Sequence, residues 1–391
     1  MDDLTRGIDS LVAVAIVAAL APFVVALLPG HRVPQVVVLI VGGILIGPQG
    51  FGLADTDSIE LFANVGLGFV FLLAGYELDP ELFRERYGRL ALIGWVVSAV
   101  LAVGLVGILT ATGFVRGIVP VSIALTTTAL GTLLPILRDN NMLEGAFGKY
   151  IVAAGATGEF LPIVAVAIFL GTTSSVGAIL SLLAVGAVAL ALTFAPRLFR
   201  GRWAERILFA GEHATSQTTL RWTVVLLLVL LAFAERFGLD IVLGAFLAGL
   251  VLRQWSFGES GQARSLQEKL DVVGYGLFIP VFFVASGMAL DVRSVAGAPL
   301  RLVAFFLFLL VVRGLPSLLV YRRALPPKSR LQMVFITATT LPMLVALSHI
   351  GLQNGTMFPE NAAALVGAGV LSVLVFPAVA VAIGAGAKAK A

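Results

Sequence analysis

The stretch YIVAAGATGEFLPIVAVAIFL (residues 150–170) decides the class of fold, because it is long enough to cross a bilayer as a helix. It carries a single charge, Glu159, near its centre. A charged side chain at the bilayer centre costs roughly 2.5–3.5 kcal/mol on insertion scales, so it usually marks a functional site. The run LVAFFLFLLVVRGLPSLLVY (302–321) places Arg313 at a comparable depth. Every other charge lies in a loop or close to the end of an apolar run.

The composition agrees with a chain that lies mostly in lipid. Of 391 residues, 59% are hydrophobic and 12% are charged, and the mean hydropathy is +1.04. Soluble domains carry roughly 25% charged residues, about twice this share. We therefore expect an all-α polytopic membrane protein with 13 transmembrane helices, at about 9–29, 33–48, 58–77, 90–111, 117–137, 149–171, 176–196, 222–235, 239–252, 272–290, 302–321, 331–350 and 361–385.

The distribution of Lys and Arg predicts the orientation of these helices. Twenty of the 26 basic residues fall in loops on one side or in the C-terminal tail, and Arg313 lies within a span. The opposite side holds five, namely Arg6, Arg116, Arg236, Arg293 and Arg301. Basic loops stay in the cytoplasm, so we expect a bacterial-type inner (plasma) membrane protein with its N-terminus outside and its C-terminus cytoplasmic. The net charge of +4 then reflects these loops and predicts no nucleic-acid partner.

Two pairs of segments match at one offset and indicate an internal repeat. VGLGFVFLLAGYELD (65–79) and VGYGLFIPVFFVASGMALD (273–291) share a Gly and a final Leu-Asp at an offset of 212 residues, and the same offset places the threonine pair 127–128 on the pair 339–340. The matched spans are seven crossings apart, so the copies have inverted topology. We expect one transmembrane unit without a C-terminal regulatory domain: helix 1 at 9–29, repeat one at 33–171, a linker helix at 176–196 and repeat two at 239–385.

The two deep charges suggest a proton carrier. Burial favours the neutral form of a carboxyl and a nearby guanidinium favours the charged form, so the two effects together let Glu159 exchange a proton near neutral pH. Arg313 keeps its proton at any working pH, and its expected role is that of charge partner. A static Glu159–Arg313 pair that holds two helices together is the alternative.

Two apolar spans carry threonines next to helix breakers. They read LTTTALGTLLP (125–135) and FITATTLPMLV (335–345). A proline in a span frees an upstream carbonyl, and freed carbonyls and hydroxyls are oxygen ligands suited to an alkali cation. Threonines that only bond their own helix are the alternative. The candidate ion and proton ligands are Glu159, Thr126, Thr127, Thr128, Thr157, Thr339 and Thr340, with Gly131, Pro135 and Pro342 as helix breaks.

Rival classes of function lack the residues that they need. The chain has no cysteine and no HExxH sequence, and only one carboxylate lies deep, so an intramembrane enzyme is disfavoured and no cofactor is expected. An ion-coupled solute symporter or a potassium channel-like protein on the same fold stays open. A single carboxylate with threonine-rich breaks fits a small cation better than an organic solute, and strong binding disfavours a passive channel.

Several segments, in order along the chain, resemble the second cation:proton antiporter family, which includes sodium/proton and Kef-type potassium/proton exchangers. They are FLLAGYELDPELF (71–83), ALTTTALGTLLPILRDNNML (124–143), LGAFLAGLVL (243–252), GYGLFIPVFFVASGMALD (274–291) and TATTLP in span twelve. The resemblance implies inverted repeats with two crossed, unwound helices, a homodimer and elevator-like alternating access. It also places the family's ion-binding acid on Glu159 and its span-eleven base on Arg313.

The chain departs from this family at one position. Members often carry two adjacent carboxylates in span six, where this chain has Gly158 and Glu159. One exchangeable carboxylate predicts electroneutral exchange of one proton for one Na⁺ or K⁺. The choice between these cations depends on ligand distances that no sequence pattern gives.

Overall fold

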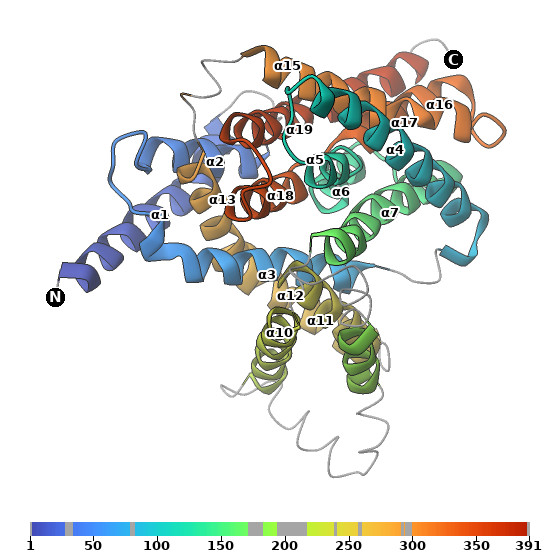
Figure 1. Cartoon of the computed structure of the whole chain (residues 1–391). Helices are drawn as coiled ribbons and strands as arrows, with labels where there is room; N and C mark the ends of the chain where they lie inside the picture. Colours follow the sequence, from blue (N-terminus) through green and yellow to red (C-terminus); the bar gives the residue numbers. More distant parts are fainter. Residues whose placement is uncertain are drawn as a thin grey trace. The chain divides into compact units, whose positions relative to one another are not determined.

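The structure is a computed structural model that describes residues 2–27, 34–78, 83–170, 183–193, 217–237, 241–256, 260–290, 293 and 299–388. The regular structure in these ranges is helical throughout (Figure 1). The chain divides into two compact units. Unit 1 comprises Met1–Ile59, Asp79–Pro162 and Phe283–Ala391, and unit 2 comprises Glu60–Leu78 and Ile163–Phe282.

Unit 1 contains most of the helices. Several of these helices are separated from the next one by only a few non-helical residues. One segment, η4, is a π-helix. Its described helices are α1 (Asp2–Leu27), α2 (Gln35–Ile46), η1 (Asp57–Ile59), α4 (Arg86–Ala111), α5 (Ile118–Ala124), α6 (Leu130–Asp139), α7 (Gly145–Phe169, whose last turns belong to unit 2), α15 (Pro299–Phe308), η4 (Leu309–Gly314), α16 (Pro316–Val320), α17 (Pro327–Ala338), α18 (Pro342–Gln353) and α19 (Pro359–Lys388).

Unit 2 is built around the packing of α3 against α11, which α10 flanks. Its helices are α3 (Glu60–Glu77), a helix at Leu183–Thr193, α10 (Thr218–Arg236), α11 (Ile241–Ser256), α12 (Ser260–Val273) and the π-helix η3 (Gly274–Phe278), with α13 (Ile279–Met288) continuing into unit 1.

Nine helices in the described ranges are long and apolar enough to cross a membrane, and three shorter apolar helices accompany them, at Gln35–Ile46, Leu183–Thr193 and Ile241–Trp255. The chain is therefore an all-helical, multi-pass membrane protein. A helical segment occurs within each of the thirteen expected ranges, but thirteen crossings stay a prediction, as do the inverted repeats. Asp79 and Asp291, which end the two matched stretches, lie outside the described residues.

Each end of unit 1 gathers loops that were expected on one side of the membrane. At one end, Arg116 lies over the Phe358 ring, and Arg301 lies over the Phe114 ring and donates hydrogen bonds to the Phe114 carbonyl and to Asn361. The other end brings Arg86 beside the turn that follows α16. Loops of one expected side thus lie together, while the side that faces the cytoplasm stays a prediction.

Two glycines let α3 and α11 approach closely in unit 2. A Cβ on Gly75 would lie 2.1 Å from the Phe246 carbonyl oxygen, and a Cβ on Gly249 would lie 2.1 Å from the Leu72 carbonyl oxygen. Small residues commonly allow such backbone contact between membrane helices. The pair therefore sets the distance between the two helices.

We expect Gly249→Ala to destabilise the protein by about 1–3 kcal/mol, because the added methyl must push α3 and α11 apart. Thermal unfolding in detergent measures the effect. Gly186→Ala is the matched control, since a Cβ at Gly186 meets no atom within 4 Å. Equal unfolding temperatures for the two variants would contradict this account of the contact.

Candidate ion-binding site

Two helices of unit 1 are interrupted near their middles. One stops at Ala124 and resumes as α6 at Leu130, and the other stops at Ala338 and resumes as α18 at Pro342. The first break thus precedes Gly131 and Pro135, whose backbones lie within α6. Pro342 is the first residue of α18, where the N–H that proline lacks would have no helical acceptor.

The two breaks hydrogen-bond to each other. The Ala129 N–H donates to the Thr339 carbonyl at 2.8 Å, and the hydroxyls of Thr127 and Thr340 lie 2.7 Å apart. These residues are buried, and α5 packs against α18 within unit 1 (Figure 1). Because buried backbone groups need partners where water is absent, each break stabilises the other.

Most of the candidate threonines also donate to their own helix. The hydroxyls of Thr126, Thr127, Thr157 and Thr339 lie 2.7–2.9 Å from the carbonyl oxygens of Ile123, Ala124, Ala153 and Phe335. This is the arrangement that a packing role predicts. A hydroxyl that donates its hydrogen keeps its oxygen lone pairs, so the same bonds also fix the oxygens in place. The geometry is therefore compatible with both roles.

Glu159 binds the start of α6. One carboxylate oxygen, Oε1, accepts hydrogen bonds from the Leu130 N–H at 2.7 Å and from the Gly131 N–H at 3.3 Å. These are the first two residues of α6, whose N–H groups have no acceptor inside the helix. Helix N-termini favour negative charge through such groups and through the helix dipole. The broken helix thus supplies a site for the carboxylate.

Arg313 approaches the same segment from the π-helix η4 and is only 3% exposed. Its Nε donates to the Thr128 hydroxyl oxygen at 3.0 Å, and its Nη2 donates to the Ala154 carbonyl at 3.0 Å. The sequence suggested that Glu159 and Arg313 pair directly. In this conformation the hydrogen bonds of the guanidinium go to these two oxygens. Arg313 thus joins Thr128 to α7, while Glu159 binds the start of α6 two residues further on.

Gly158 makes room for this arrangement. A Cβ at residue 158 would lie 2.5 Å from Thr128 Oγ1 and 2.7 Å from Arg313 Nη2. The Gly158 carbonyl also accepts the Thr128 N–H at 3.0 Å. The space that a second side chain would need beside Glu159 is therefore filled by the hydroxyl and the guanidinium.

Two further residues support the breaks and were not expected from the sequence. The Thr337 carbonyl accepts the Thr128 hydroxyl at 2.6 Å, and its own hydroxyl lies 3.2 Å from the Arg313 carbonyl oxygen. Ser372 of α19 accepts the Thr340 N–H at 3.1 Å and lies 2.8 Å from the Thr340 carbonyl oxygen. Ser372 thus replaces helix hydrogen bonds that the break removes. The sequence feature that could have identified Thr337 and Ser372 is a hydroxyl side chain within an otherwise apolar span.

These features define a class of site: a charged, oxygen-rich cluster in a multi-pass membrane protein, at the point where two helices are broken. Residues 13–384 match the sequence model of the family described as "Sodium/hydrogen exchanger, transmembrane". The chain therefore belongs to the sodium/hydrogen exchanger family. The resemblance found in its sequence motifs is confirmed at this level.

Individual relatives support the same assignment. The chain is 26% identical to the putative Na(+)/H(+) antiporter YjbQ of Bacillus subtilis (strain 168), over 95% of this chain and 62% of that protein. It is 26% identical to the glutathione-regulated potassium-efflux system protein KefC of Escherichia coli O9:H4, over 78% of this chain and 48% of that protein. The chain thus spans about half to two thirds of the length of these relatives, which are named as transporters.

A solved structure shares the fold. The sodium proton antiporter MjNhaP1 from Methanocaldococcus jannaschii superposes with a TM-score of 0.71, covering 98% of this chain and 99% of that chain, at 17% sequence identity. The likeness establishes the architecture, an all-helical polytopic membrane fold.

We expect Ser372→Ala to leave the Thr340 N–H buried without its acceptor, at a cost of about 1–3 kcal/mol. Hydrogen exchange at the Thr340 amide should accelerate, and the unfolding temperature should fall. Ser98→Ala is the control, because the buried Ser98 hydroxyl donates only to Gly94 of its own helix. Unchanged exchange at Thr340 would show that Ser372 does not support the break.

Proposed function

We propose that the chain is a secondary active transporter that exchanges protons for Na⁺ or K⁺, with Glu159 as the group that both ions visit. The observation that carries the proposal is the carboxylate held by the first N–H groups of α6, at the point where two broken helices meet. The carboxyl is protonated in one half of the cycle and binds the cation in the other. The named activities of YjbQ and KefC support the reaction class.

The ligand chemistry favours a monovalent cation. Around the breaks, the candidate ligand atoms are the oxygens of one carboxylate, of threonine hydroxyls and of backbone carbonyls. These are hard oxygen ligands. One carboxylate matches one positive charge. Across the described ranges no group of three His, Cys, Asp or Glu residues could hold a metal ion. An alkali cation is therefore a better substrate than a multivalent one.

Arg313 has a supporting part in this proposal. Its guanidinium hydrogen-bonds to Thr128, which also hydrogen-bonds to Thr337 across the two breaks. Arg313 and Glu159 bind neighbouring residues, Thr128 and Leu130, so the positive charge near the site favours one proton or one cation over two. We infer that exchange is electroneutral, with one proton for one cation, because Gly158 leaves Glu159 as the single acid at this place.

The transport cycle follows from the same features. We propose thirteen crossings in two inverted repeats, with the N-terminus outside and the C-terminus cytoplasmic in a plasma membrane. Unit 1 contains the charged site, and we propose that it carries Glu159 between the two faces of the membrane in an elevator-like motion. We also propose that the protein assembles as a homodimer. Potassium efflux is a second candidate for the physiological role, because KefC is named for it.

Glu159→Gln should abolish exchange, because the amide neither loses a proton nor balances a cation. Proteoliposomes with an imposed pH gradient and added Li⁺, Na⁺, K⁺ or Rb⁺ measure this as proton flux, which should fall to the level of empty liposomes. Glu144→Gln is the matched control, since Glu144 is an exposed acid just before α7 and should keep full activity. Full exchange by Glu159→Gln would disprove the mechanism.

Electroneutral exchange predicts a rate that does not respond to membrane potential. Moving one net charge would couple to the potential by about 2.3 kcal/mol per 100 mV, enough to change the rate strongly. The test sets the potential with an ionophore for an ion that the protein does not exchange, and follows cation uptake at constant pH gradient. A rate that rises steeply with potential would mean that net charge moves in each cycle.

A further inference from the structure

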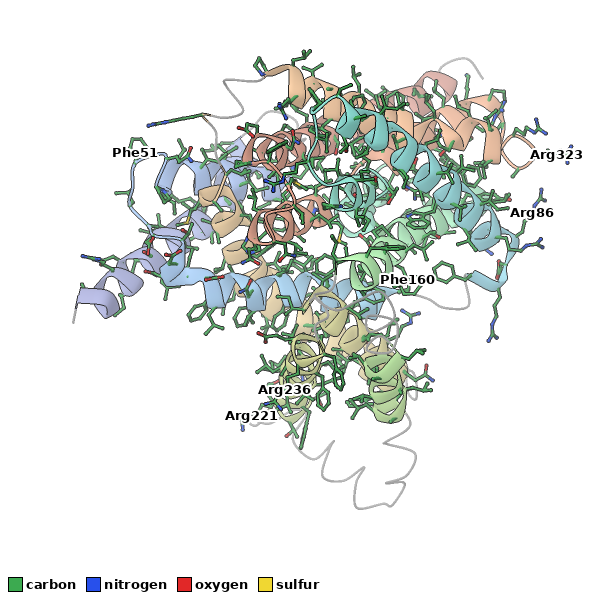
Figure 2. All side chains as sticks on the ribbon, viewed as in Figure 1. Phe51, Arg86, Phe160, Arg221, Arg236 and Arg323 are labelled. Carbon is green, nitrogen blue, oxygen red and sulfur yellow. The ribbon has the colours of Figure 1, made fainter. Side chains whose placement is uncertain are left out.

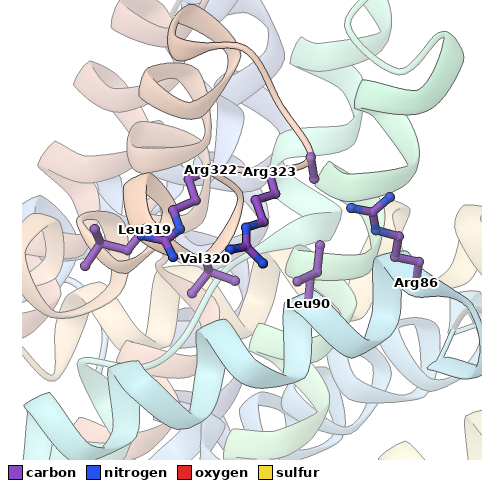
Figure 3. Close-up of a pocket in the computed structure, with 7 residues that line it drawn as sticks. Arg86, Leu90, Leu319, Val320, Arg322 and Arg323 are labelled. Carbon is purple, nitrogen blue, oxygen red and sulfur yellow. The ribbon is translucent and has the colours of Figure 1, made fainter.

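Three arginines surround an open cavity at one end of unit 1. Arg86 begins α4, and Arg322 and Arg323 lie in the turn after α16. The cavity measures about 190 Å³, and Figure 3 shows Leu90 between the side chains of Arg323 and Arg86. We call this the arginine pocket; its lining consists of Arg86, Leu90, Leu319, Val320, Arg322, Arg323 and Ala324.

The charges of the arginine pocket are not balanced by the described protein. In the ranges that the structure covers, the side chains of Arg86, Arg322 and Arg323 make no hydrogen bond or ion pair. By contrast, Arg301 bonds the Phe114 carbonyl and Asn361 at the other end of unit 1. Glu85 precedes Arg86 but does not line the pocket. Three positive charges that line one small cavity repel one another, so an anion in the pocket would stabilise the arrangement.

The backbone around the pocket is firmly held. The ring of Tyr150 in α7 contacts the ring of Tyr87, 4.7 Å away, and the ring of Tyr321, 5.6 Å away. The Tyr321 carbonyl accepts hydrogen bonds from the N–H groups of Ala324 and Leu325. The turn that carries two of the arginines is thereby fixed relative to α4 and α7. A ligand there would lose little affinity to ordering of the backbone.

The pocket lies where a charged end meets an apolar surface. Leu319, in its lining, is 72% exposed, and α4 exposes Leu92, Ile93 and Val96 within the two turns that follow Leu90. In a membrane protein such surface faces lipid chains. A ligand that fits must therefore be anionic at one end and apolar at the other. Guanidinium groups also match phosphate geometry.

We propose that the arginine pocket binds the phosphate of an anionic phospholipid, whose acyl chains lie along Leu90 and Leu319. Basic pockets between membrane helices are a general means of recognising anionic headgroups. The site lies apart from Glu159 and its role does not rest on ion exchange. The bound lipid would hold the start of α4 to the turn after α16.

The test uses the full chain, purified in detergent and depleted of lipid. Native mass spectrometry and thermal unfolding follow the addition of phosphatidylglycerol or phosphatidylcholine. Phosphatidylglycerol should bind and raise the unfolding temperature of the wild type. Its apparent affinity should be roughly tenfold weaker or worse in the triple variant Arg86→Gln, Arg322→Gln, Arg323→Gln, because three charge-assisted contacts are removed.

The control removes two arginines elsewhere. Arg221→Gln with Arg236→Gln changes exposed residues of α10 (Figure 2) and should bind phosphatidylglycerol as the wild type does. Equal lipid occupancy in the triple variant and the wild type would overturn the proposal. The same stabilisation by inorganic phosphate alone would also overturn it, in favour of a free anion. If the triple variant does not fold, the three single variants should each lower occupancy, and unchanged occupancy in all three would overturn the proposal.

Discussion

The structure depends on hydrogen bonds between two helices that are broken at the same place. A helix that stops inside a membrane leaves N–H and C=O groups without partners, and lipid offers none. Here the Ala129 N–H binds the Thr339 carbonyl, the Thr128 hydroxyl binds the Thr337 carbonyl, and Ser372 closes the gap at Thr340. Neither break would be stable alone, so the pair is the constraint from which the site follows.

Glu159 and Arg313 bind polar groups that the breaks leave without partners in a helix. The unpaired N–H groups at the start of α6 hold the Glu159 carboxylate, and the Thr128 hydroxyl receives Arg313. Glu159 thus binds the first residues of α6, while Arg313 joins Thr128, in the first break, to Ala154 of α7. In the proposed function, a change of occupant at Glu159 would alter its hydrogen bonds with Leu130 and Gly131, and so the start of α6. We propose that ion binding is coupled to conformational change through this contact.

The sequence predicted the features that depend on neighbouring residues along the chain. Apolar runs predicted the helices, and threonines beside Gly131 and Pro342 predicted two interrupted spans. It could not predict that the first break precedes Gly131, because the break position is set by bonds to Thr339, more than 200 residues away. Nor could it show that Gly158 makes room for Arg313, or that Ser372 caps a break, since both depend on tertiary packing.

The central claim is that a proton and a cation exclude each other at Glu159. The most direct measurement is proton release when saturating Na⁺ or K⁺ is added to the purified protein in weakly buffered detergent solution, with a pH indicator as readout. The account predicts up to one proton per chain, released at a pH where Glu159 is protonated, with the amount falling as the starting pH rises. Cation binding that releases no proton at any pH would contradict it.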